Sequence, residues 1–127
     1  MNKLIGLLII SALIHINIFA ENPIDEKVNF LPEGNRAEYF FDRGLGYYNL
    51  NQYSNALKFI DQALEIYISN NDKPNMARCY NNIGNIYNKL NIFNKAMEYH
   101  LLSLELGETL NDEKGIVSSL NNIGNVL

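Results

Sequence analysis

The chain has 127 residues, of which 47% are hydrophobic and 19% are charged; this balance is typical of a folded globular protein and excludes a disordered one. A chain of this length can build one small hydrophobic core. The formal net charge is -4 and no cluster of Lys and Arg is present, which argues against a nucleic-acid partner because phosphate binding needs a basic surface.

Residues 1–20 are predicted to be a secretory signal peptide. They start with one cation, Lys3, continue through an apolar run, and end at Ala20, a small residue suited to cleavage. The alternative is an uncleaved membrane anchor, but His15 and Asn17 interrupt the run and leave it short of the roughly 20 apolar residues that span a bilayer. We therefore expect an exported protein, located in the periplasm, in the cell envelope or outside the cell. Membrane contact is expected only through an uncleaved signal or a missing downstream segment.

Residues 21–35 hold two of the three prolines and several acids, and we expect an extended leader there. From Arg36 onward the apolar residues recur at helical spacing, as Leu57, Ile60 and Leu64 illustrate. No alternating strand pattern of useful length is found. The predicted class is all-α.

An internal repeat organises the rest of the chain. Gly44, Gly84 and Gly124 are each 40 residues apart, and their neighbours repeat in the same register. Self-similarity at a fixed period of this size is typical of a solenoid of helix-turn-helix units. The predicted units are a first repeat at 36–70, a second at 76–110, and the first helix of a third at 115–127. Because Leu127 falls inside that last helix with no partner helix after it, we expect a fragment, a truncated product or the visible part of a longer protein.

The repeated glycines fall in the middle of predicted helices, where Gly costs about 1 kcal/mol relative to Ala. Such a residue is tolerated where a second helix comes close, and we expect Gly44 to face Ala56 and Gly84 to face Ala96.

The connectors carry their own signals. Asn51 and Asn91 are expected to end the first helix of each repeat in the left-handed conformation, which Asn adopts more readily than other residues with a side chain. Asp72 and Asp112 are expected to be N-caps of the following helices, and Pro74 suits a first helical turn.

These residues resemble the tetratricopeptide repeat, whose pattern is W-x2-L-G-x2-Y, then A-x3-F, then P. The second copy matches it with Tyr80, Ile83, Gly84, Tyr87, Ala96 and His100. The first copy has Arg43 in place of the Leu, both copies lack the closing Pro, and the period is 40 rather than about 34. The resemblance covers residues 36–127. It implies a right-handed α-solenoid that mediates protein–protein interaction. That the chain is not an enzyme is expected because its residues form no catalytic constellation.

No catalytic constellation, metal site or cofactor site is predicted. Beyond residue 20 the chain has one His and one Cys, and no glycine-rich phosphate loop. Cys79 is expected to be a buried small hydrophobe that cannot form an internal disulfide, and His100 is expected to pack at the edge of the core.

In the family, the first helix of each repeat lines a concave groove, and this implies where a partner would bind. The candidate groove residues are Phe41, Leu45, Tyr48, Asn49, Asn81, Asn85, Asn88, Lys89, Asn121 and Asn125. Asn offers both a donor and an acceptor, which suits pairing with the backbone of a bound peptide, although the chain is rich in Asn throughout. The negative net charge favours a basic or neutral segment. The function expected is an exported scaffold that holds a protein or peptide segment; the alternative is the extracytoplasmic sensor region of a longer membrane kinase or regulator.

Overall fold

The computed structural model describes residues 26–127, and in this range it contains helices and no strands. The described residues belong to two units, one that ends at Leu31 and one of Pro32–Leu127. The described part of the first unit holds a short 3-10 helix, η1 (Glu26–Phe30). The predicted signal peptide lies outside the described residues. Of the stretch 21–35, predicted to be an extended leader, the described residues 26–35 hold η1 and the start of the next helix instead.

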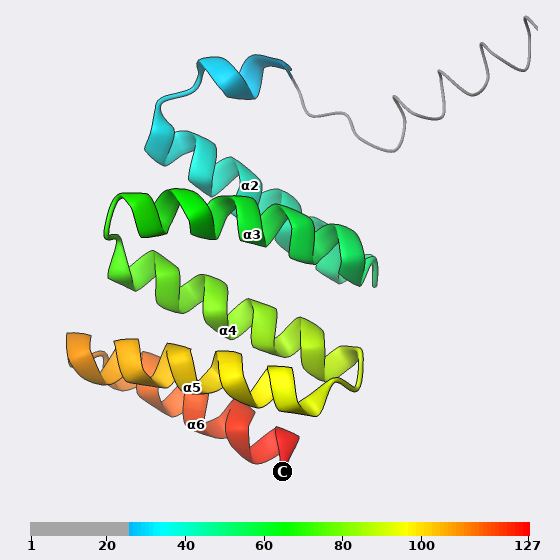
Figure 1. Ribbon diagram of the computed structural model, residues 1–127, viewed down its shortest axis with the longest axis vertical. Coiled ribbons are helices and arrows are strands. Elements are labelled where there is room, and N and C mark those ends of the chain that lie inside the picture. The colour runs from blue at the N-terminus through cyan, green and yellow to red at the C-terminus, as the bar shows by residue number, and fades with distance from the viewer. Residues whose placement is uncertain (1–25) are drawn as a thin grey trace, which may run out of the picture. The chain divides into compact units, whose positions relative to one another are not determined.

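The second unit consists of five α-helices joined by turns of a few residues: α2 (Glu33–Asn49), α3 (Tyr53–Ser69), α4 (Lys73–Lys89), α5 (Phe93–Leu110) and α6 (Glu113–Val126). Each helix contacts the next one along the chain, and together they follow one another down the long axis of the picture (Figure 1). The pairs α2–α3 and α4–α5 are two helical hairpins, and α6 packs on α5 as the first helix of a third. The prediction of an all-α helical-repeat solenoid is confirmed.

The turns are built on left-handed asparagines. Asn51 and Asn91 have φ of 58° and 60°, as predicted, and Asn71 and Asn111 adopt the same conformation, with φ of 53° and 52°. In each turn the residue after the asparagine donates its backbone N–H to a carbonyl five positions back at 2.9 Å, which satisfies one of the carbonyls left unpaired at a helix end. The same short closure therefore serves all four turns.

The two predicted N-caps differ. Asp72 accepts a hydrogen bond from the backbone N–H of Asn75 at 3.2 Å, and Pro74 lies in the first turn of α4, as expected. Asp112 occupies the N-cap position of α6 but makes no capping hydrogen bond with its side chain. The side chain lies instead against the backbone of Gly115, which has no Cβ to keep it away.

The helix interfaces depend on the two mid-helix glycines, and in each hairpin the side chain nearest to the glycine is that of the residue one turn after the expected alanine. Gly44 lies against the Ile60 side chain and the carbonyl of Ala56, so a close approach of α3 is confirmed there. Gly84 lies against the imidazole ring of His100: a Cβ added at Gly84 would come within 2.6 Å of the ring atoms. Ala96 is fully buried but is not the nearest neighbour of Gly84. The spacing predicted a small residue opposite the glycine, whereas the larger residue one turn later fills the space.

Candidate functional site

The surface formed by the first helices α2, α4 and α6, here called the first-helix surface, is built from residues that lie about one repeat apart. Glu38 on α2 pairs with Arg78 on α4, 40 positions later, and Asn81 on α4 bonds to Asn122 on α6, 41 positions later. The 40-residue period therefore places equivalent residues of neighbouring repeats side by side along this surface.

Between α2 and α4, Arg78 is the central residue. Its guanidinium donates from both terminal nitrogens to the Glu38 carboxylate, each at 3.4 Å, and donates to Asn75 Oδ1 at 2.7 Å. The same guanidinium lies 4.3 Å from the centre of the Phe41 ring, a cation–π geometry. Phe41 is only 2% exposed, because Arg78 and the neighbouring helices cover it.

A buried tyrosine on α3 fixes the other side of this carboxylate. Tyr67 donates its hydroxyl to Glu38 Oε2 at 2.8 Å. This hydrogen bond, followed by the attraction of Arg78, lowers the pKa of Glu38 below its ordinary value. Burial, together with the bond to Glu38, raises the pKa of Tyr67. Glu38 is therefore ionised at neutral pH and tied to both α3 and α4.

Between α4 and α6 the junction is made of neutral polar side chains. Asn81 accepts from Asn122 Nδ2 at 2.7 Å and donates to Ser118 Oγ at 3.4 Å. Deeper in, Ser119 donates to Ser103 Oγ at 3.1 Å, and Ser103 donates to the carbonyl of Ala77 at 3.1 Å. These bonds connect α4, α5 and α6 without any charge.

A cavity of about 270 Å³ lies between α4 and α6, beside this junction. Its polar lining includes the cations Arg78 and Lys114, the acidic residue Asp112 and the amide of Asn81. The remaining lining residues are Pro74, Ala77, Ser103, Gly107, Gly115 and Ser118.

A row of open amides continues along the first-helix surface. Asn85 and Asn88 are half-buried on α4, and Asn121 and Asn125 are exposed on α6. Among residues 26–127, none of these four side chains makes a hydrogen bond to protein, whereas the Asn81 amide is engaged at both ends. Open amide groups can donate to and accept from a ligand backbone without first losing a bond within the protein.

The remaining predicted groove residues differ in how much surface they offer. Leu45 and Tyr48 are half-buried on α2, and the Tyr48 ring lies edge-on to Tyr53 with the ring centres 5.9 Å apart. Asn49 and Lys89 are exposed. Phe41 supports the surface from beneath, because its side chain is almost completely covered.

Several residues that make or support the junctions of this surface were not predicted from the sequence. Glu38, Tyr67, Ser118 and Asn122 make the bonds just described, yet none belongs to the predicted groove set. A signal was available for one pair: Glu38 and Arg78 carry opposite charges one period apart on two first helices, so the repeat itself predicts that they meet. Tyr67 gave no such signal, because its hydrogen bond depends on the packing of α3 against α2.

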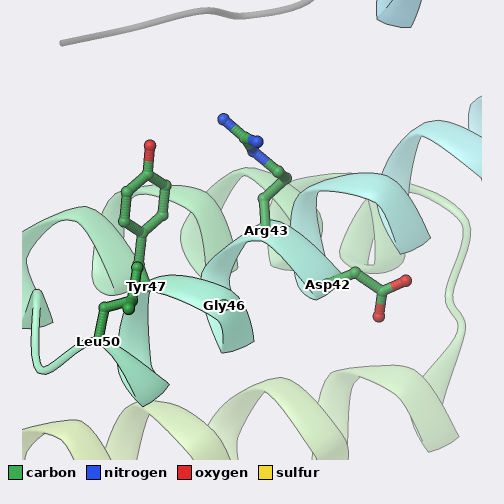
Figure 2. A pocket seen from close by; sticks show the side chains of 5 residues that line it. All are labelled: Asp42, Arg43, Gly46, Tyr47 and Leu50. Carbon is green, nitrogen blue, oxygen red and sulfur yellow. The ribbon is translucent and has the colours of Figure 1, made fainter. Parts of the chain in front are cut away.

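A second hollow lies on another stripe of α2 and has a volume of about 310 Å³ (Figure 2). It is lined by Asp42, Arg43, Gly46, Tyr47 and Leu50. The Arg43 and Tyr47 side chains extend side by side from α2, and the guanidinium carbon lies 5.6 Å from the centre of the Tyr47 ring. This contact explains how the fold accommodates Arg43 at a position where the repeat pattern has Leu: the arginine packs its length against an aromatic face.

Cys79 and His100, the two residues whose side chains could take part in a reaction, both have structural roles. Cys79 is fully buried and unpaired, and burial raises the pKa of its thiol to about 12, so the reactive thiolate is suppressed at neutral pH. His100 is fully buried in the α4–α5 interface rather than at the edge of the core. Within the described range, no cluster of His, Cys, Asp and Glu could hold a metal ion. No helix between residues 26 and 127 is both long and apolar enough to cross a bilayer.

Comparison with known proteins agrees with this geometry. The family model of the tetratricopeptide repeat matches residues 36–109, more than half of the chain. The chain is a tetratricopeptide repeat protein. Such proteins are scaffolds for protein–protein interaction, and this general role follows from membership of the family.

Among solved structures, the N-terminal domain of stress-induced protein-1 (STI-1) from C. elegans is similar, with a TM-score of 0.64 and 23% identity over 76% of this chain and 72% of that one. At this identity the likeness concerns the tetratricopeptide repeat fold alone. No curated protein sequence gives a significant match.

Proposed function

We propose that this tetratricopeptide repeat protein is an exported scaffold that holds a segment of a partner protein along its first-helix surface. The observation that carries the proposal is the row of four asparagines whose amides have no hydrogen-bonding partner among residues 26–127. These residues, Asn85, Asn88, Asn121 and Asn125, lie on two consecutive first helices. A peptide laid across α4 and α6 would pair its backbone with them.

The local charges indicate what kind of segment would bind. No Asp or Glu occurs between Asp72 and Glu98, so the charged residues of α4 are all cations; Arg78 is paired with Glu38, and Lys89 is exposed. The net charge of the whole chain predicts a basic or neutral segment. The charges nearest the ligand act most strongly, however, because salt screens charges that are more than about 10 Å away. A neutral or acidic segment therefore suits the surface of α4 better than a basic one.

Binding is tested by selecting peptides from a displayed random library on the full chain and titrating the selected peptide, labelled with a fluorophore, into three proteins. The first is the wild type and the second carries Asn85→Ala, Asn88→Ala and Asn125→Ala. Each amide contributes about 1 kcal/mol, so the triple variant should bind about a hundredfold more weakly. Asn81 is left intact because it holds α6 in place.

The third protein is a matched control that carries Asn70→Ala and Asn94→Ala, which remove two exposed amides outside the first helices. It should bind like the wild type. Equal affinity of the triple variant and the wild type, with unchanged helical circular dichroism, would refute the proposal for this surface.

Export is a separate element of the proposal and is supported by the composition of residues 1–20. The chain is expressed in a bacterial host, and N-terminal sequencing of the recovered protein then tests cleavage. We expect the mature chain to begin at Glu21 and to be recovered outside the cytoplasm. Recovery of uncleaved chain from the cytoplasm alone would contradict export without affecting the binding test.

A further inference from the structure

One edge of the helical unit concentrates exposed apolar side chains. The turns α2–α3 and α4–α5, residues 50–55 and 90–95, lie on the same side of the helical stack, and are together called the turn edge (Figure 1). They are neighbours, since residues 51–55 and Leu90 line one hollow of about 290 Å³. On this edge Leu50 is 66% exposed, Phe93 48%, Ile92 44% and Leu90 37%. Leu50 and Leu90 occupy equivalent places in the two repeats, and Ile92 and Phe93 add two exposed apolar side chains on the second turn.

The charge of the turn edge is opposite in sign to that of the whole chain. Lys89 and Lys95 flank the second turn and are exposed, while no acidic residue occurs between Asp42 and Asp61 or between Asp72 and Glu98. The remaining surface of both turns is neutral and rich in asparagine. The protein has a net charge of -4, so its acids are gathered elsewhere and the turn edge is the apolar and cationic part.

The opposite edge, formed by the α3–α4 and α5–α6 turns, lacks this combination. Asp72, Asp112 and Glu113 lie there beside Lys73 and Lys114, so acids outnumber cations, and Ile68 is the exposed large apolar residue nearest to it, at 50% exposure. The difference between the edges is not imposed by the fold, because all four turns share the same backbone closure.

We infer that the turn edge is a membrane-contact surface that binds the headgroup region of an anionic lipid bilayer. Leu50, Ile92 and Phe93 are suited to entering the boundary between headgroups and acyl chains, where aromatic and aliphatic side chains are favoured. Lys89 and Lys95 can lay their methylene stems along the same boundary while their ammonium groups contact lipid phosphates. Exposed aliphatic and aromatic side chains that are flanked by two lysines and have no acidic residue among them favour an anionic lipid surface. This contact is additional to the membrane contacts expected from the sequence.

The test uses the absence of tryptophan from the chain. Two full-length variants each carry one tryptophan: Phe93→Trp on the turn edge and Ile68→Trp near the opposite edge, both at half-exposed positions. Each is titrated with vesicles of phosphatidylcholine alone and of phosphatidylcholine with phosphatidylglycerol. Because the emission is local to the tryptophan, any attachment through residues 1–20 does not mimic insertion of an edge.

We expect the emission of Trp at position 93 to shift to the blue with the anionic vesicles and to stay unchanged with the neutral ones, and the emission at position 68 to stay unchanged with both. Each lysine contributes roughly fivefold to partitioning onto an anionic surface. Adding Lys89→Glu and Lys95→Glu to Phe93→Trp should therefore weaken vesicle binding at least tenfold, while the helical circular dichroism confirms that the variant folds.

Three results would overturn the inference: no shift at position 93, an equal shift at both positions, or an equal shift with neutral and anionic vesicles. A shift produced by an acidic amphipathic peptide but not by vesicles would also overturn it and assign the turn edge to a protein partner instead.

Discussion

The two hairpins share the same stacked aromatic pair but place different residues against the mid-helix glycine. In the first, Tyr47 stacks on Phe59 with the ring centres 5.3 Å apart; in the second, Tyr87 stacks on Tyr99 at 5.6 Å. The residue over the glycine, however, is the aliphatic Ile60 in one hairpin and the imidazole of His100 in the other.

This difference separates the volume of the side chain from its polarity. Ile60 and His100 are both completely buried, so either side chain fills the space that a glycine leaves. The imidazole has a polar cost that isoleucine lacks, because neither ring nitrogen has a hydrogen-bond partner within residues 26–127. An unsatisfied buried polar group costs about 1–3 kcal/mol. The position therefore selects for volume, and the second hairpin tolerates a less favourable group there.

The largest effect is expected from filling the space beside the mid-helix glycine, a feature that both hairpins have. Gly84→Leu would force side-chain atoms into the His100 ring and should lower the free energy of unfolding by about 2–3 kcal/mol. Gly46→Leu is the matched control, because nothing lies within 4 Å of a Cβ at that position; it should be neutral or stabilising, since Leu has the higher helix propensity. Urea unfolding measures both. Similar losses for the two variants would show that the glycines do not mark a close contact.

Exchanging the residues over the glycines tests the comparison directly. Ile60→His should cost about 2 kcal/mol, because it replaces a buried aliphatic side chain with unpaired nitrogens, and His100→Ile should gain about 1 kcal/mol. Both values come from urea denaturation at neutral pH. A loss of stability in His100→Ile would mean that the imidazole makes a favourable interaction which the aliphatic side chain cannot replace.

Acid should destabilise the second hairpin through the same histidine. Burial lowers the pKa of His100 from its ordinary value of 6.5, so the unfolded chain binds a proton more readily than the folded one. The contribution of neutral His100 to the free energy of unfolding is therefore complete above pH 6.5, and it is lost as the pH falls from 6.5 toward the pKa of His100 in the folded protein. The free energy of unfolding, measured across this range, should decrease for the wild type and change less for His100→Ile. Parallel profiles of the two proteins would contradict this assignment.

The smallest effect is expected at the surface junction between the hairpins. The Glu38 and Arg78 side chains are each 47% exposed, and an ion pair of this kind contributes about 0–1 kcal/mol. A double-mutant cycle with Glu38→Ala and Arg78→Ala measures the coupling. We expect less than about 1 kcal/mol, decreasing with added salt. A coupling several times larger would make this pair, rather than apolar packing, the main connection between the hairpins.

The sequence predicted the features that depend on local chemistry. The spacing of Gly44 and Gly84 indicated the repeat, and Asn51 and Asn91 indicated left-handed helix ends, because few other residues adopt that conformation. The motifs of the second copy indicated the family. Asn71 and Asn111 also adopt the left-handed conformation, but their sequence context suggested only the caps of the following helices.

The features that depend on side-chain direction between helices were less accessible. In both hairpins the side chain nearest to the glycine belongs to the residue one turn after the alanine, Ile60 or His100, and this is set by where the two helices cross, which the spacing along the chain does not show. For the candidate site, the period placed the groove residues on the first helices. It did not separate Asn81, which is bonded to α6, from Asn85, which is open, because both are asparagines on the same helix.

The left-handed asparagines at positions 51, 71, 91 and 111 fall 20 residues apart, half the repeat period. The joints at the two edges share one backbone closure, so the array can be divided at either edge. A block of 40 residues excised between Asn51 and Asn91 is as complete a module as one excised between Asn71 and Asn111, and duplicating either leaves every helix in register. The gene for such a chain can gain or lose a hairpin by recombination at any of these joints, so the length of the array can change in evolution or in the laboratory without designing a new turn.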